Sequence, residues 1–291
     1  MQKFIMIFFE VIVFQSLILC QEVPYKKFDS RRIDVGTLYV YEYSRNSKDF
    51  LPVDKRYIYI KSLNDIESLI VPIKDSTNTW LDNISMNWNY MMLAKRIWRN
   101  LENKNTMGIG SSLEGYENID FANKTLNGVN TQKLKDGFKK IYFTNRFESI
   151  PTYFYSSTSL MDLWFALRFY PINKNMITVN NVSNDYNTSF EIKYEGQDKV
   201  NVPYGNVTCY KFELVPQLSF FMRLLHSPKK AFIWLSSEGN SRYMVKYINN
   251  NEQNTFIRSM EYRLLKKEKM SPSEWEKFKA EHGVKKDKKL G

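Results

Sequence analysis

Apolar and polar positions alternate along much of the C-terminal half of the chain, and a period of two is the pattern of half-buried strands. The alternation is clearest in residues 207–215, where Tyr210 and Phe212 fall on one side of the run and Lys211 on the other. Turn-forming residues separate this run from its neighbours. The stretch therefore predicts one antiparallel meander with strands at Ser189–Val202, Val207–Val215, Ala231–Leu235, Arg242–Ile248 and Thr255–Arg263.

Similar runs before residue 80 and near residue 140 predict further strands. In the first of them, Tyr39, Tyr41 and Tyr43 share a face, and we expect that aromatic face to point to the core. Pro72 lacks the amide hydrogen of a sheet ladder, so the third strand either lies at an edge or ends there. These expected strands are Gly36–Ser44, Arg56–Lys61, Glu67–Ile73 and Lys140–Phe147.

The segment between residues 80 and 130 is less regular. From Trp88 to Leu101 the apolar side chains recur at nearly helical spacing, which favours a helix over the alternative of two strands. Residues 103–130 are rich in Gly, Asn and Ser. That composition predicts a loop with at most one strand.

Two other segments carry stronger helical signals. In Ser157–Arg168, Trp164 and Leu167 lie on one apolar stripe, and a hydroxyl side chain at the start can cap the helix. Residues 271–274, Ser-Pro-Ser-Glu, combine an N-cap, a proline at the first helical position and the glutamate of a capping box. Trp275 gives this second, short helix an apolar side that can dock on the body of the protein or on a membrane.

The N-terminus has the features of a secretory signal. Lys3 precedes the apolar run Phe4–Leu19, which is interrupted by Glu10 and is short for a membrane-spanning helix. We expect a cleaved signal and export to the periplasm or cell envelope, with lipid anchoring through Cys20 or an uncleaved anchor as alternatives. The expected organisation is a signal segment at 1–20, a single β-rich domain at 21–265 and a basic helical tail at 266–291.

The formal net charge of +11 is unevenly placed, since ten basic and five acidic residues from Arg263 onward give the tail +5. Such a tail can make peripheral contact with anionic lipid, and a solvated terminus is the alternative. Basic and aromatic residues also interleave elsewhere in the chain. An export signal nevertheless argues against nucleic acid as a partner.

Three segments together resemble the exported bacterial family called domain of unknown function 3108. The first, Ser157–Pro171, is similar to the short helix of that family, with Asp162 and Arg168 at the matching places. The second, Val202–Val215, resembles its Pro-x-Gly turn and the strand that follows. The third, residues 231–246, contains its Trp-Leu-Ser strand and the following turn.

This resemblance implies where the protein acts and how it is built. It implies a mainly β (α+β) fold in the cell envelope, with a curved antiparallel sheet or half-barrel and a few short helices. It implies no established activity. A curved sheet with an apolar concave face can hold an acyl chain.

Motifs that carry chemistry are sparse in this sequence. It contains no phosphate-binding glycine loop, no Cys or His spacing for a metal and no Gly-x-Ser-x-Gly elbow. We therefore expect no catalytic, metal or cofactor site. Cys209 lies in a predicted strand, and the chain has only two histidines to serve it as a base, so we expect a small buried hydrophobe.

The resulting functional expectation is a non-catalytic exported protein that binds a hydrophobic ligand, such as a lipid, or an envelope protein. The alternatives are an interaction or scaffolding module at the membrane and, less favoured, an enzyme acting on envelope polymer. Side chains that either line a ligand site or serve only the structure are Asp162, Trp164, Arg168, Tyr210, Phe212 and Trp234.

Overall fold

The computed structural model of the protein describes residues 28–45, 50–73, 79–87, 92–101, 107, 109, 111–146, 154–156, 164–165, 167–169, 172, 176–182, 188–217, 230–249 and 260–284. Fifteen strands in these ranges form one sheet, in the order β8-β7-β6-β5-β4-β3-β2-β1-β15-β14-β13-β12-β11-β10-β9.

The strands of the first half are β1 (Thr37–Ser44), β2 (Pro52–Ile60), β3 (Asp65–Pro72), β4 (Trp80–Asn87), β5 (Met92–Asn100), β6 (Ser112–Asp120), β7 (Thr125–Leu134) and β8 (Gly137–Arg146). Those of the second half are β9 (Phe154–Ser156), β10 (Met176–Val182), β11 (Thr188–Val202), β12 (Gly205–Gln217), β13 (Ala231–Ser236), β14 (Met244–Asn249) and β15 (Met260–Lys269). The described residues also form a 3-10 turn, η1 (Ser30–Arg32), and an α-helix, α4 (Pro272–Glu281).

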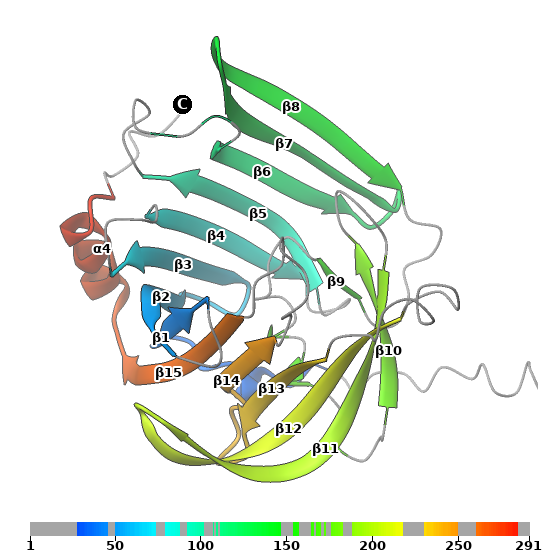
Figure 1. Ribbon diagram of the computed structural model, residues 1–291, viewed down its shortest axis with the longest axis vertical. Coiled ribbons are helices and arrows are strands. Elements are labelled where there is room, and N and C mark those ends of the chain that lie inside the picture. The colour runs from blue at the N-terminus through cyan, green and yellow to red at the C-terminus, as the bar shows by residue number, and fades with distance from the viewer. Residues whose placement is uncertain are drawn as a thin grey trace, which may run out of the picture.

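Two antiparallel meanders make up the sheet, and the pairing of β1 with β15 joins them. In that pairing Tyr39 lies opposite Lys267, and Tyr43 lies opposite Tyr262. Only β9 and β10 pair in parallel among the described strands. The sheet curls so that β9, at one edge, comes near β5 without closing a ladder with it (Figure 1). The expected curved antiparallel sheet and the single meander of residues 189–263 are confirmed.

Strand β1 is buried on both of its faces. The predicted aromatic core face is present, since Tyr39 and Tyr41 are 1% and 2% exposed within the large cluster on the concave side. The opposite face is buried too, because Leu38 and Val40 pack in a second cluster with Trp275 of α4. Helix α4 therefore covers the outer side of the sheet near β1 to β4, and we call the side away from the concavity the outer face (Figure 1).

The helix expected between Trp88 and Leu101 is wrong. Residues 80–87 and 92–100 are strands β4 and β5, paired to each other and to β3 and β6. In β5, Ile97 is 40% exposed on the outer face, whereas the adjacent Trp98 points to the other side and donates its Nε1–H to Oγ of Ser112. Ladder hydrogen bonds from two neighbouring strands outweigh the weak local preference for a helix.

The loop with at most one strand expected over residues 103–130 is wrong in part, because that stretch contributes two strands, β6 and the start of β7. Gly115 and Gly128 lie within these strands and have a packing role there. A Cβ added to Gly115 would meet the ring of Trp98, and one added to Gly128 would meet the ring of Phe143. Glycine in a strand marks such a close approach of a neighbouring group.

Other expected elements shift only at their boundaries. Strand β3 lies between β2 and β4 and ends at Pro72, so of the two alternatives for that proline the strand end is observed. Strand β15 continues to Lys269, beyond the boundary expected at residue 265. Of the helix expected over residues 157–168, residues 164, 165 and 167 are helical, and residues 157–163 and 166 lie outside the described residues.

Helix α4 begins as its sequence predicts. The Oγ atom of Ser271 accepts a hydrogen bond from the backbone N–H of Glu274, and the Glu274 carboxylate accepts one from the backbone N–H of Ser271. Of the two surfaces considered for the apolar side of this helix, it lies on the body of the protein. Trp275 is fully buried there, with its ring 5.3 Å from that of Tyr59.

Candidate functional site

An aromatic cluster lines the concave side of the sheet, and Trp164 lies at its centre. The Trp164 ring lies 5.8 Å from Tyr41, 6.2 Å from Tyr247 and 5.2 Å from Tyr262. The tyrosines come from three strands, β1, β14 and β15, and Trp164 packs against them from outside the sheet ladder. Burial raises the pKa of all three tyrosines, so their hydroxyls stay neutral at physiological pH. We call these four residues the aromatic cluster.

A row of buried charges lies beside the aromatic cluster on the same side of the sheet. Asp82 is 2% exposed and forms ion pairs with two arginines. Arg56 Nη2 lies 3.4 Å from its Oδ2, and Arg96 Nη2 lies 3.1 Å from its Oδ1. Arg56 also donates from Nε to Oγ of Ser68 at 3.2 Å. Buried charges persist where they are paired in this way. We call Arg56, Ser68, Asp82 and Arg96 the charged row.

Arg56 connects the charged row to the aromatic cluster. Its Cζ atom lies 5.9 Å from the centre of the Trp164 ring. Burial raises the pKa of Tyr262, and the charge and hydrogen bond of Arg56 act in the opposite direction. Trp164 is 3% exposed, and its Nε1–H has no hydrogen-bond partner within the described structure. A buried donor without an acceptor is uncommon in folded proteins, because it costs free energy.

Trp234 lies on the opposite side of the sheet from Trp164. The register places Trp234 beside Lys211 and Lys246, whereas Ile233 pairs with Tyr247 of the aromatic cluster. The two lysine Nζ atoms lie 5.8 and 5.6 Å from the Trp234 ring. Its Nε1–H donates to Oδ2 of Asp198 at 3.2 Å. Trp164 and Trp234 therefore cannot line one ligand site.

The other residues singled out in the sequence lie at separate places. Phe212 is fully buried on the concave side of β12, and its neighbour Tyr210 is half-buried under the guanidinium group of Arg242. Arg168 is buried, and its Nη1 donates to the backbone carbonyl of Arg32 at 3.2 Å, while Nη1 of Arg32 donates to the backbone carbonyl of Arg168 at 2.7 Å. Asp162 and Cys20 lie outside the described residues.

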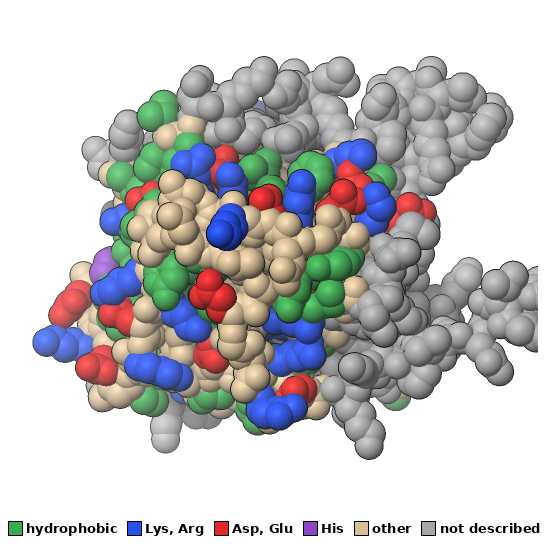
Figure 2. Space-filling model, turned by 90° about the horizontal axis from the view of Figure 1, so that it is seen from below, with side chains coloured by type: hydrophobic (Ala, Val, Ile, Leu, Met, Phe, Trp, Pro, Cys, Tyr) green, Lys and Arg blue, Asp and Glu red, His purple; other side chains and the backbone are tan. Residues whose placement is uncertain are grey.

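The outer face of the C-terminal meander carries mixed charges. Lys246 and Arg263 both pair with the buried carboxylate of Glu261, at 3.2 and 2.6 Å. Figure 2 shows basic and acidic side chains intermingled on the face seen from below, the side on which β11 and β12 lie.

The sulfur chemistry offers no reactive group in the described chain. Cys209 is fully buried, and burial raises the pKa of its thiol to about 12. A thiol in this state is a poor nucleophile near neutral pH. Among the described residues no cluster of three or more His, Cys, Asp or Glu side chains is arranged to hold a metal ion, and none of the helices there is long and apolar enough to cross a bilayer.

Sequence reasoning missed the charged row completely. Arg56 begins a predicted strand, and its position on the tyrosine face of the sheet depends on its register with Tyr41. Arg96 lies in the segment expected to be a helix, so its contact with Asp82 could not be predicted. The available signal was a charged residue at an alternating position inside an apolar strand, as at Arg56 and Asp82.

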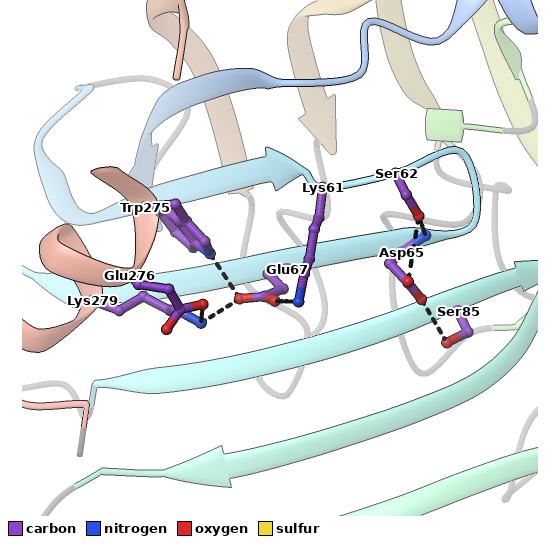
Figure 3. A network of polar contacts seen from close by, with 8 residues as sticks. All are labelled: Lys61, Ser62, Asp65, Glu67, Ser85, Trp275, Glu276 and Lys279. Atoms are coloured by element: carbon purple, nitrogen blue, oxygen red, sulfur yellow. Dashed lines mark hydrogen bonds and ion pairs between the residues drawn. The ribbon is translucent and has the colours of Figure 1, made fainter. Parts of the chain in front are cut away.

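A second buried polar cluster fastens α4 to the outer face. Oε2 of Glu67, on β3, accepts hydrogen bonds from Nζ of Lys279 at 2.6 Å and from Nε1 of Trp275 at 2.7 Å (Figure 3). Lys61 approaches the other oxygen of the same carboxylate at 3.2 Å. Burial disfavours the charged form of Glu67, but the hydrogen bonds from Lys279 and Trp275 outweigh it and lower the pKa. The cluster therefore holds α4 in place.

No family model matches the chain, and no curated protein matches it. The matches to solved structures are weak in both sequence identity and TM-score. A β-barrel-like protein of domain of unknown function 1849 from Brucella abortus is 7% identical with a TM-score of 0.37, and the match covers 80% of this chain and 97% of that one. A protein from Bacteroides fragilis, assigned as exported and with a YmcC-like fold, is 9% identical with a TM-score of 0.30 and coverages of 81% and 97%.

The hypothetical lipoprotein YmcC from Escherichia coli is 10% identical with a TM-score of 0.27, and the match covers 87% of this chain and 94% of YmcC. None of the three descriptions names an activity, and at these identities no residue role is transferred to this chain. The words exported, β-barrel-like and lipoprotein in these descriptions are said of one neighbour each. The specific resemblance to domain of unknown function 3108 stays a prediction.

Proposed function

We propose that this protein is an exported, non-catalytic envelope protein that holds an amphipathic ligand against the concave face of its sheet. The observation that carries the proposal is the junction of the aromatic cluster and the charged row. There the buried Trp164 Nε1–H has no hydrogen-bond partner among the described residues, and the Arg56 guanidinium lies against the same ring.

The aromatic cluster supplies the apolar half of such a site. Trp164 and its three tyrosine neighbours present flat, neutral rings from separate strands, and rings of this kind pack well against acyl or isoprenoid chains. Retention of an apolar chain would follow from removal of its surface from water, at about 25 cal/mol per Å².

The polar half of the site is the Trp164 donor together with Arg56. An ester, hydroxyl or phosphate oxygen of the ligand would accept the free Nε1–H and offset the cost of its burial. Asp82 is engaged by two guanidinium groups, an arrangement that neutralises charge rather than one that transfers a proton. This supports a binding role over an enzymatic one.

Native mass spectrometry of the protein purified from its own envelope fraction tests the proposal. We expect a co-purifying mass that extracts into organic solvent. Trp164→Phe keeps a ring but removes the donor, so it should lower ligand retention. Trp234→Phe removes a donor on the opposite side of the sheet and should leave retention unchanged.

Circular dichroism establishes that each variant is folded before retention is compared. Bare polypeptide in repeated preparations of the native protein would overturn the proposal. Equal retention by folded Trp164→Phe and wild type would remove Trp164 from the site.

A further inference from the structure

An exposed apolar row crosses the outer face of four consecutive strands. The register places Ile97 of β5 opposite Tyr116 of β6, Tyr116 opposite Val129 of β7, and Val129 opposite Tyr142 of β8. Ile97, Tyr116 and Tyr142 are 40%, 36% and 75% exposed. Phe138 lies on the same face of β8, four residues before Tyr142, and is 41% exposed. We call Ile97, Tyr116, Val129 and Tyr142 the outer row.

This surface continues the face that α4 covers farther along the sheet. Leu81 of β4 packs in the cluster under α4, and Asn83, on the same face of β4, is the partner of Ile97. In the ranges that the structure describes, no helix packs on the outer face of β6 to β8 (Figure 1). The apolar cover that α4 provides near β1 is therefore missing from the outer row.

Basic side chains surround the outer row. Lys95 places its Nζ 5.6 Å from the Tyr116 ring, and Lys140 precedes Tyr142 by two residues on the same face of β8. Glu114 lies opposite Arg99, and Asp120 hydrogen-bonds with Asn123 in the turn that follows β6. On this face of β5 to β8 the basic residues are Lys95, Arg99, Lys133, Lys140 and Arg146, and the acidic ones are Glu114 and Asp120.

We propose that the outer row binds the surface of a bilayer that contains anionic lipid. Exposed tyrosine and aliphatic side chains ringed by lysine and arginine have the composition of an interfacial membrane contact. The excess of basic residues complements anionic headgroups, whereas a neutral protein partner would leave it without a counter-charge. The apolar side of α4 is not available for this contact, because Trp275 is fully buried against the sheet.

Sedimentation of the full-length protein with vesicles tests the proposal. We expect stronger binding to phosphatidylcholine vesicles that contain phosphatidylglycerol than to phosphatidylcholine alone, and weaker binding at high salt. Lys140→Gln should lower the partition coefficient about fivefold, the factor expected for one basic residue at an anionic surface. Tyr142→Ser should also lower it, since an exposed ring is lost.

Two matched controls separate the outer row from general surface effects. Lys277→Gln removes an exposed charge from α4, and Tyr204→Ser removes a 42% exposed tyrosine from the β11–β12 turn. Both controls should bind like the wild type. All variants keep the apolar segment at residues 4–19, so its contribution cancels in the comparison.

Three results would overturn the proposal. The first is equal binding to both kinds of vesicle. The second is a loss in Lys277→Gln as large as that in Lys140→Gln, which would assign the contact to the tail. The third is no vesicle binding together with self-association that Tyr142→Ser abolishes in analytical ultracentrifugation, which would assign the outer row to contact with a second copy.

Discussion

Nζ of Lys279 lies 2.6 Å from Oε2 of Glu67, and the two residues are 212 positions apart in the chain. Both side chains are buried, at 9% and 8% exposed. The pair joins the C-terminal helix to the third strand of the first meander, and Trp275 donates to the same oxygen. One buried carboxylate therefore joins α4 to β3 through two hydrogen bonds.

Replacement of Lys279 by Met is expected to lower the free energy of unfolding by about 3 kcal/mol, because it leaves Glu67 buried with one fewer partner. Urea denaturation followed by circular dichroism measures the change. Lys277→Met, on the exposed side of the same helix, is the control and should change stability by less than about 0.5 kcal/mol. Equal stability of the two variants would show that the ion pair does not hold α4.

The same cluster makes stability depend on pH. The ordinary pKa of a glutamate is 4.5, and that of Glu67 is lowered in the folded protein. Its contribution is therefore complete above pH 4.5 and is lost as the pH falls through the lower, folded value. We expect the stability difference between wild type and Glu67→Gln to be largest near neutral pH and to shrink in acid. A difference that stays constant from pH 7 to pH 3 would contradict this assignment.

Among substitutions in the charged row, replacement of Asp82 should lower stability most, because two arginines share its carboxylate. Asp82→Asn removes the counter-charge of both Arg56 and Arg96, and we expect a loss of about 3–5 kcal/mol in the free energy of unfolding. Asp65→Asn, at an exposed carboxylate of β3, should cost less than about 1 kcal/mol. Thermal or urea unfolding of both variants provides the test. A loss for Asp82→Asn no larger than that of the control would mean that the row contributes little.

Gly115 should tolerate no side chain while Trp98 is present. A methyl group at residue 115 would collide with the Trp98 ring, so Gly115→Ala is expected to cost about 1–3 kcal/mol. The double variant Gly115→Ala/Trp98→Leu should lose less stability than the sum of its two single variants, because the smaller side chain makes room for the methyl group. Additive losses in urea denaturation would refute a direct clash.

The strands of the C-terminal meander were predictable because their signal is local. In β12 the alternation of Phe212 with Lys211 survives in the structure, with Phe212 buried and Lys211 beside Trp234 on the other face. The start of α4 was equally predictable from the sequence, since the capping box lies within four residues. Alternation and caps depend on neighbours along the chain, so a single sequence displays them.

The segment from residue 80 to residue 130 was misread for the opposite reason. Its side chains have nearly helical spacing, and Gly115 and Gly128 suggest loops when they are read alone. Both glycines instead make room for large rings on adjacent strands, and those rings come close only once the strands have paired. The ladder with β3 on one side provides hydrogen bonds that the local pattern does not reveal.

The sequence by itself determined a mainly β protein, the course of its C-terminal meander and the start of its last helix, since each depends on residues close together in the chain. Tertiary structure alone decided that β1 pairs with β15 and is buried on both of its faces. Tertiary structure also placed Trp164 beside Arg56, with Trp234 on the opposite side of the sheet. It also brought Lys279 to Glu67. The physical reason is that these contacts depend on strand register and sheet curvature, which are set by pairing between distant segments.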